Sequence, residues 1–80
     1  MASTSPGYGI TIRVEGPPDA NPVALATTVI TGAGATITAL DVVESLLEKV
    51  VIDITCDTID AEHAEQITAA ISLNSDLTVR

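Results

Sequence analysis

The chain has 80 residues, enough for one small domain, which buries only about 60–65% of its unfolded surface and so gains from self-association. Eleven acidic residues face three basic ones, and the formal net charge of −8 opposes binding to nucleic acids and to anionic membrane surfaces. Hydrophobic residues make up 46% of the chain, but Tyr8 is its single aromatic residue. The core must therefore be built from Val, Ile, Leu and Ala.

Cellular location is indicated by what the sequence lacks. Cys56 is the single cysteine, which excludes an internal disulfide and favours a cytoplasmic protein. No stretch reaches the roughly 18 apolar residues of a membrane span. Residues 1–7 are small and polar, and we expect them to form a flexible leader ahead of a domain over residues 8–80.

The first predicted elements are a strand, a loop and a helix. Tyr8–Glu15 alternates apolar and polar residues, which is typical of a half-buried strand. Two prolines and a glycine then make residues 16–21 a loop. Asn21 is a candidate N-cap for a helix that begins at Pro22, because proline is tolerated at the first helical position. The apolar stripe of this helix consists of Ala26, Val29, Ile30 and Ala33.

A glycine stop and a second strand follow this helix. Gly32 or Gly34 can take the positive φ of a helix C-cap. Residues 35–43 are rich in β-branched side chains and predict a strand. Residues 44–49 must then turn the chain, although no Gly, Pro or Asn specifies the turn. A helix over residues 41–51 is the alternative.

The last elements repeat this order. Residues 50–57 alternate again and predict a strand with Val50, Ile52, Ile54 and Cys56 on one face. Asp60 is a candidate N-cap for a second helix, which Asn74 would end in the left-handed conformation. The apolar stripe of that helix consists of Ala64, Ile67, Ala70 and Ile71. Residues 76–80 are long enough for a final strand.

The order βαββαβ predicts an α+β, ferredoxin-like sandwich, a four-stranded antiparallel sheet with two helices on one face. Core packing is expected for Cys56, because it continues an apolar series. The opposite sheet face would carry Thr11, Arg13, Asp53 and Thr55. His63 has no second His or Cys at ligand spacing, so we expect it to be solvated in the first helical turn.

Several segments together resemble a known family. A loop with Asp and Pro, a helix with an early leucine and then G-A-x-I-T-A-L-D-V resemble the start of an ACT domain, a ligand-sensing module of metabolic enzymes. The fuller pattern resembles the N-terminal ACT domain of bacterial NAD-dependent malic enzymes. It consists of Ser5-Pro6, Tyr8–Glu15, Thr38–Val42, Val51–Cys56 and Glu62–Glu65. The resemblance implies a βαββαβ fold and a cytoplasmic regulatory domain that works as a homodimer or higher homo-oligomer.

The resemblance also implies a site for a small amino-acid effector. The loop before the first helix, together with the second strand of a neighbouring subunit, is the usual site in ACT domains, and helix N-termini favour anions. The candidate residues are Asp19, Ala20, Asn21, Pro22, Val23 and Asp41. Two simpler interpretations stay open, namely that Asn21 only caps the helix and that Asp41 is an ordinary solvated carboxylate. Many ACT domains have glycine where Val23 stands.

The sequence contains no catalytic or metal-binding constellation, so we expect a chain without enzymatic activity or cofactor. The resemblance implies that NAD, a divalent metal and malate decarboxylation belong to the catalytic domain of a parent enzyme. A second hypothesis is a structural oligomerisation domain without a ligand. A third takes Leu46 and Leu47, adjacent at the predicted hairpin tip, as a contact for another domain.

Overall fold

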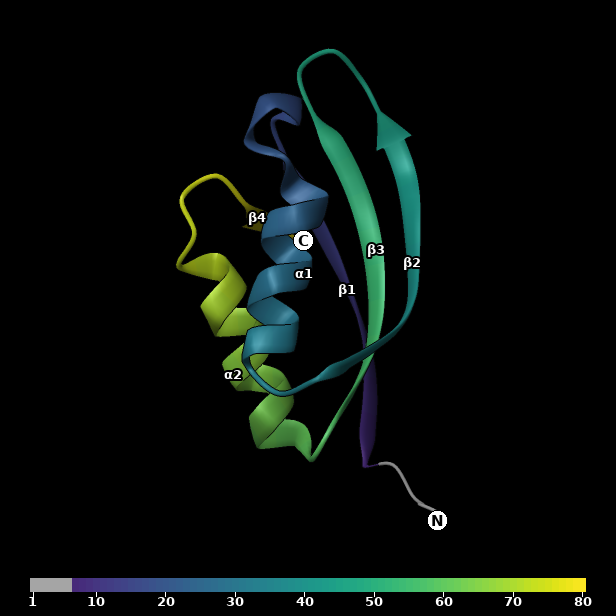
Figure 1. The fold of residues 1–80 in the computed structure, drawn as a ribbon, viewed down its shortest axis with the longest axis vertical. Helices are drawn as coiled ribbons and strands as arrows, with labels where there is room; N and C mark the ends of the chain where they lie inside the picture. Colours follow the sequence, from purple (N-terminus) through teal and green to yellow (C-terminus); the bar gives the residue numbers. More distant parts are fainter. Residues whose placement is uncertain (1–6) are drawn as a thin grey trace.

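The computed structural model describes residues 7–80 as a four-stranded sheet with two helices on the same side of it (Figure 1). The strands are β1 (Tyr8–Gly16), β2 (Thr36–Ser45), β3 (Val50–Thr58) and β4 (Thr78–Val79). The helices are α1 (Pro22–Gly32) and α2 (Ala61–Ser72), and the 3-10 turn η1 (Pro18–Ala20) precedes α1. Neighbouring strands are antiparallel in the order β2-β3-β1-β4, which confirms the predicted α+β class. Of the expected leader, residues 1–6 lie outside the described residues.

The centre of the molecule is the pair β1 and β3. The two strands pair over their full length, from Tyr8 opposite Thr58 to Gly16 opposite Val50. Their alternation turns one face toward the helices, and the buried side chains on it include Ile12, Val14, Ile52, Ile54 and Cys56. The expectation that Cys56 is a core residue is therefore confirmed.

Helix α1 begins at Pro22, as predicted, and its stripe packs on the sheet. Ala26 and Ile30 are fully buried, and burial of an isoleucine side chain of this kind stabilises the fold by about 1.5–3 kcal/mol. The chain reverses after the helix at Gly34, whose φ of 91° is a conformation that glycine adopts without steric cost. The C-terminal stop is thus Gly34, while Gly32 is the last helical residue.

Helix α2 begins as predicted, since the carboxylate of Asp60 accepts a hydrogen bond of 2.8 Å from the backbone N–H of His63. Its residues Ile67 and Ile71 are fully buried. The prediction for its other end is wrong, because Asn74 has no positive φ. The Asn74 side chain instead accepts a hydrogen bond from the N–H of Asp76, at 3.2 Å, and so forms a local turn that leads into β4.

The connection between β2 and β3 is a hairpin, so the alternative of a helix over residues 41–51 is wrong. Leu46 donates its N–H to the carbonyl of Lys49 at 2.8 Å and closes the turn. Strand pairing outweighs the helix propensity of this segment, because it satisfies the backbone hydrogen-bonding groups along both strands. The pairing shifts register twice, between Ile37 and Ala39 and between Val42 and Glu44. These irregularities leave a regular stretch at Ala39–Val42.

The last strand is shorter than predicted. Only Thr78 and Val79 form β4, and they pair with Glu15 and Val14 of β1. Leu77 precedes them and is buried in the core, 5% exposed. Within residues 7–80, β4 therefore covers the β1 edge of the sheet at Val14 and Glu15.

Candidate functional site

The outer face of the sheet, opposite the helices, carries an organised polar row. Arg13 donates two hydrogen bonds to Asp53, from Nε to Oδ1 at 2.7 Å and from Nη2 to Oδ2 at 2.8 Å. These bonds lower the pKa of Asp53 and raise that of Arg13. The hydroxyl groups of Thr11 and Thr55 lie 3.0 Å apart on the same face. The prediction that these four residues share the outer face is confirmed.

Asp41 extends this row onto β2. It pairs across the strands with Asp53 and is exposed. Because directly paired residues share a face, the Asp41 carboxylate lies on the outer side of the sheet, next to a carboxylate that Arg13 already engages. Within one chain, Asp41 is therefore on the opposite side from α1.

The loop before α1 holds the other five predicted site residues as one continuous segment. Asp19 and Ala20 belong to η1, while Pro22 and Val23 open α1 and are buried and half-buried, respectively. Between them, Asn21 adopts the left-handed conformation, with φ 57° and ψ 60°, and its side chain makes no capping hydrogen bond. Asn21 is therefore the N-cap residue of α1, as predicted, but it caps the helix without a side-chain hydrogen bond. Asparagine suits the position because it tolerates positive φ.

This loop still exposes backbone donors. Helical geometry leaves the N–H groups of the first turn, such as those of Val23 and Ala24, without intrahelical acceptors. The Asn21 carbonyl accepts the first intrahelical hydrogen bond, from Leu25 at 3.1 Å. Asp19 adds a negative charge beside these donors, and Val23 packs against the core. The segment can accept a small carboxylate, although its acidic neighbour reduces the attraction.

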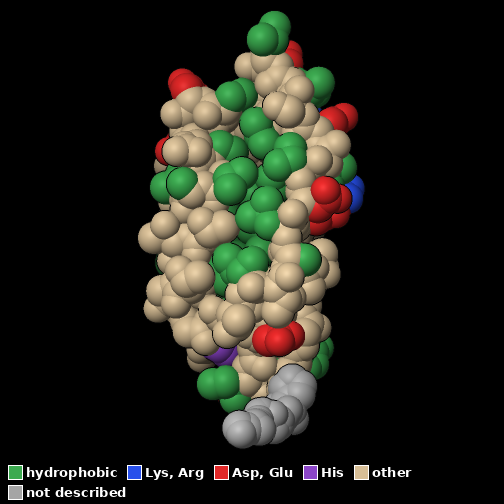
Figure 2. Space-filling view, turned by 45° about the vertical axis from the view of Figure 1, so that its right-hand side comes forward, with side chains coloured by type: hydrophobic (Ala, Val, Ile, Leu, Met, Phe, Trp, Pro, Cys, Tyr) green, Lys and Arg blue, Asp and Glu red, His purple; other side chains and the backbone are tan. Residues whose placement is uncertain are grey.

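The inner face of β2 is the largest feature that sequence patterning did not reveal. Leu40 and Val42 are 39% and 49% exposed, whereas their cross-strand partners Ile54 and Ile52 are fully buried. Figure 2 shows hydrophobic side chains gathered in a band along the side where the β2 edge comes forward. The apolar residues of β2 and β3 give the same sequence signal, but the core under the helices includes Ile52, Ile54 and Cys56 of β3, whereas β2 contributes the half-buried Ile37 at its start. We call Leu40, Val42 and the outer backbone edge of β2 the β2 seam.

The β2 seam has features of an association surface. It lies at the end of the strand order, so the outer backbone edge of a ten-residue strand is unpaired within residues 7–80. Beyond it, the hairpin tip exposes Leu46 by 46% and Leu47 by 98%. Exposed apolar surface next to an open strand edge is typical of a protein interface.

His63 has a structural role that the sequence did not indicate. Its Nδ1 atom accepts a hydrogen bond of 2.9 Å from the N–H of Ile59, and its Nε2 atom lies 2.8 Å from the carbonyl oxygen of Ala33. These contacts require the tautomer with the proton on Nε2. The expectation of a solvated side chain is wrong, because the imidazole is half-buried and ties the start of α2 to the end of α1.

Groups able to bind metal or act as nucleophiles are not assembled in the described part of the chain. No cluster of three or more His, Cys, Asp or Glu side chains suited to a metal ion occurs within residues 7–80. Burial raises the pKa of the Cys56 thiol, and the charge of Asp57 acts in the same direction. Over the same residues, no helix is long and apolar enough to cross a membrane.

Comparisons with protein-family models, with curated proteins and with solved structures found no match to this chain. The features that bear on function are therefore the β2 seam, the loop before α1 and the acidic charge of the chain.

Proposed function

We propose that this chain is a non-catalytic regulatory domain of the ACT type, with a ferredoxin-like βαββαβ fold, that self-associates through the β2 seam. The observation that carries this proposal is the exposure of Leu40 and Val42 beside the outer edge of β2, which has no strand partner among residues 7–80. A second copy related by a two-fold axis would continue the sheet across the two β2 strands and cover these side chains. The small size of the domain favours such an arrangement, because its own core is limited.

The regular stretch of β2 defines where the two copies would meet. Ala39–Val42 lies between the two register shifts, so antiparallel pairing of this stretch with its equivalent avoids the bulges. Asp41 and Glu44 of both copies would then approach each other on an already acidic molecule. Association should therefore strengthen as salt screens this repulsion, whereas the apolar contribution remains.

The effector would bind where the two copies meet. In this proposal the first-turn N–H groups of α1 receive the carboxylate of an amino acid, and Asp41 of the second copy receives its ammonium group. The position of Asp41 on the outer face of an edge strand supports a shared site, because one chain does not bring it to the loop. Asp19, Ala20, Asn21, Pro22 and Val23 complete the proposed binding segment.

Two measurements test this proposal together. Light scattering should give a dimer or higher oligomer for the natural chain and a monomer for Leu40→Asp, while Leu47→Asp serves as a control at the hairpin tip. Melting temperature should then be measured with the twenty amino acids, malate and acetyl-CoA. A ligand at a hundred times its Kd stabilises by about 2.7 kcal/mol, which is about 10 °C or more for a domain of this size. A monomeric natural chain would contradict the proposal.

The parent protein in this proposal is an NAD-dependent malic enzyme of the cytoplasm, whose catalytic domain would hold NAD and a divalent metal. The chain itself contributes regulation and assembly. Malate turnover by the 80-residue chain would contradict this division of roles.

A structural oligomerisation domain without an effector is the second candidate. Val23 supports it, because a half-buried valine packed on the core stands where glycine would let a ligand approach the backbone. In that case Asp19→Ala and Asp41→Asn should leave assembly intact, and no compound of the panel should raise the melting temperature. The third hypothesis, a contact at the hairpin tip, predicts that Leu46→Gln with Leu47→Gln weakens assembly of the parent enzyme but not of this domain.

A further inference from the structure

The imidazole of His63 joins the turn between β3 and α2 to the turn between α1 and β2. Its Nδ1 atom accepts the N–H of Ile59 at 2.9 Å, and its Nε2 atom lies 2.8 Å from the carbonyl oxygen of Ala33. Figure 1 shows both turns at the same end of the molecule, where α1 leads into β2 and β3 leads into α2. One side chain therefore connects two turns that lie 30 residues apart in the sequence.

Both contacts require a neutral imidazole. An N–H donor faces Nδ1, so this atom must keep its lone pair, and a carbonyl faces Nε2, so this atom must carry the proton. A flip of the ring would exchange nitrogen for carbon at both contacts. When a proton from solvent adds to Nδ1, the ring has a donor on each nitrogen, and the N–H of Ile59 then faces another N–H. Protonation therefore breaks this contact directly.

The charged groups around the ring do not remove the conflict. Asp60 and Glu62 border His63 at the start of α2, and both are exposed, so water screens their attraction for an imidazolium. The positive end of the α2 macrodipole opposes the charge, whereas the last carbonyls of α1 favour it. Helix α1 and residues 33–36 carry no titratable side chain. The direct contact between Nδ1 and the Ile59 N–H therefore dominates.

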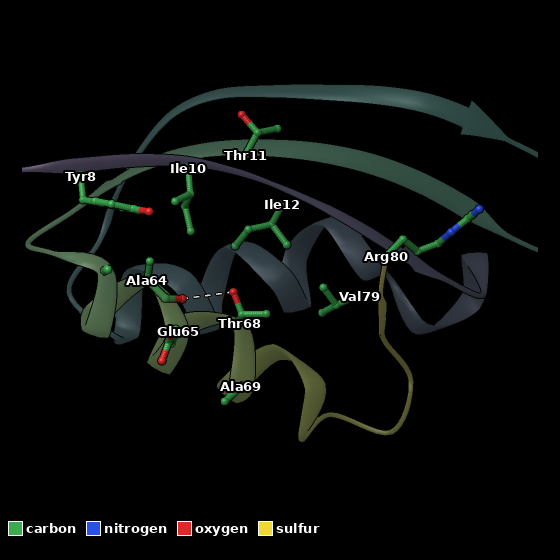
Figure 3. A pocket seen from close by; sticks show the side chains of 11 residues that line it. Tyr8, Ile10, Thr11, Ile12, Ala64, Glu65, Thr68, Ala69, Val79 and Arg80 are labelled. Carbon is green, nitrogen blue, oxygen red and sulfur yellow. Dashed lines mark hydrogen bonds between the residues drawn. The ribbon is translucent and has the colours of Figure 1, made fainter.

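The titratable groups on the sheet and on the other face of α2 lie away from the ring. Asp57 follows Cys56, whose side chain is buried in the core, so Asp57 lies on the outer face of the sheet. Tyr8 and Glu65 line a separate groove between β1 and α2 (Figure 3), and neither borders His63.

The effect of protonation should remain local, because the neighbouring contacts do not titrate. The hydroxyl of Thr58 donates to the carbonyl of Tyr8 at 2.6 Å and holds the end of β3 against β1. Ile59 is 74% exposed, so water can replace Nδ1 as the acceptor once the ring moves away. Departure of the ring also releases the carbonyl of Ala33, next to Gly34 in the turn that leads into β2.

We propose that His63 is a pH-sensitive tether: its protonation between about pH 8 and 5 releases the ring from Ile59 and Ala33 and loosens the turns on both sides. The tether consists of residues within the turns 33–35 and 59–63, so it is independent of the proposed self-association and effector site. It would make the start of β2 sensitive to pH.

The test is an NMR titration of the full 80-residue chain labelled with ¹⁵N. At about pH 8, the ring signals of His63 should identify the tautomer with the proton on Nε2. As the pH falls to about 5, the amides of Ile59 and Gly34 should shift together with the ring signals. The protection factor of the Ile59 amide should fall about 10-fold, whereas that of Ile54, within β3, should not change.

Two variants separate the tether from other titrating groups. In His63→Asn the amide oxygen can accept the Ile59 N–H but does not titrate, so the pH response at Ile59 should disappear. Asp60→Asn is the matched control, because asparagine still caps α2 while the nearest carboxylate is removed, and it should keep the response.

Several outcomes would overturn the proposal. They are a proton on Nδ1 at about pH 8, a ring that stays neutral down to about pH 5, and a ring that titrates without a change at the Ile59 amide. A response that persists in His63→Asn or is lost in Asp60→Asn would also overturn it, since another group would then be its source. If His63→Asn does not fold, the titration of the natural chain decides by itself.

Discussion

The two edges of the sheet are covered to different extents within residues 7–80. On the β2 side a full-length strand has no strand partner along its outer edge and its inner side chains are partly uncovered, so Leu40 is 39% exposed. On the β1 side β4 pairs with Val14 and Glu15, and Leu77, just before β4, is only 5% exposed. Exposure is therefore decided by which neighbouring elements cover a side chain, because the side chains themselves are equally apolar.

The largest expected difference in stability is between alanine substitutions of Leu77, which is buried, and Leu40, which is exposed. Leu77→Ala should lower the free energy of unfolding by about 2–5 kcal/mol, because it leaves a cavity in the core. Leu40→Ala should cost about 1 kcal/mol or less in the monomer, since the side chain is already partly hydrated. Urea denaturation at a concentration low enough to separate the copies gives both values. Equal losses would mean that Leu40 is buried within one chain.

Two glycines of β1 repeat the contrast on a smaller scale. A Cβ at Gly16 would lie 2.7 Å from the carbonyl oxygen of Asp76, so Gly16→Ala should destabilise the fold by about 1–3 kcal/mol. Near the start of β1, a Cβ at Gly9 would meet the Asp57 carboxylate at 3.5 Å, an ordinary contact, so Gly9→Ala should be nearly neutral. Thermal unfolding of the two variants tests the difference. A large loss for Gly9→Ala would contradict the free space on the outer face at this position.

The polar row that runs from β1 to β2 should produce a pH-dependent effect. Arg13 holds the pKa of Asp53 below its ordinary value, so the unfolded state binds the proton first as the pH falls. This stabilisation is complete above about pH 4, near the unfolded pKa, and is lost as the pH falls through the lower folded pKa. Asp53→Asn should therefore flatten the loss of stability in acid.

Arg13→Gln is the matched partner of that variant in a double-mutant cycle. It removes both hydrogen bonds to Asp53. The two single variants and the double variant should show the same shallow acid dependence. An unchanged slope in Asp53→Asn would contradict the assignment.

The smallest expected effect concerns Cys56, in the covered middle of the sheet. Because it is fully buried and its pKa is raised, a thiol reagent should not modify it in the native protein. Labelling should proceed only through unfolding, so Leu77→Ala should accelerate it strongly and Leu40→Ala much less. Fast labelling of the natural chain would show that β3 is not protected.

Local sequence features predicted most of the secondary structure. The alternation in residues 8–15 and 50–57, Pro22 at the start of α1 and Asp60 at the start of α2 each depend on neighbouring residues, and each prediction was confirmed. The errors occurred where a backbone group had more than one possible partner. Asn74 forms a side-chain turn in place of a left-handed cap, and His63 bonds a carbonyl thirty residues away.

The sequence by itself determined the α+β class, the antiparallel sheet with its helices, and the apolar faces of the central strands, because periodicity and capping act over a few residues. It also predicted the loop residues Asp19–Val23 as one segment. Only the tertiary structure decided that Asp41 lies on the outer face and that Leu40 and Val42 are uncovered. These features depend on which elements distant in sequence pack over a given strand, because that packing determines which side chains are buried.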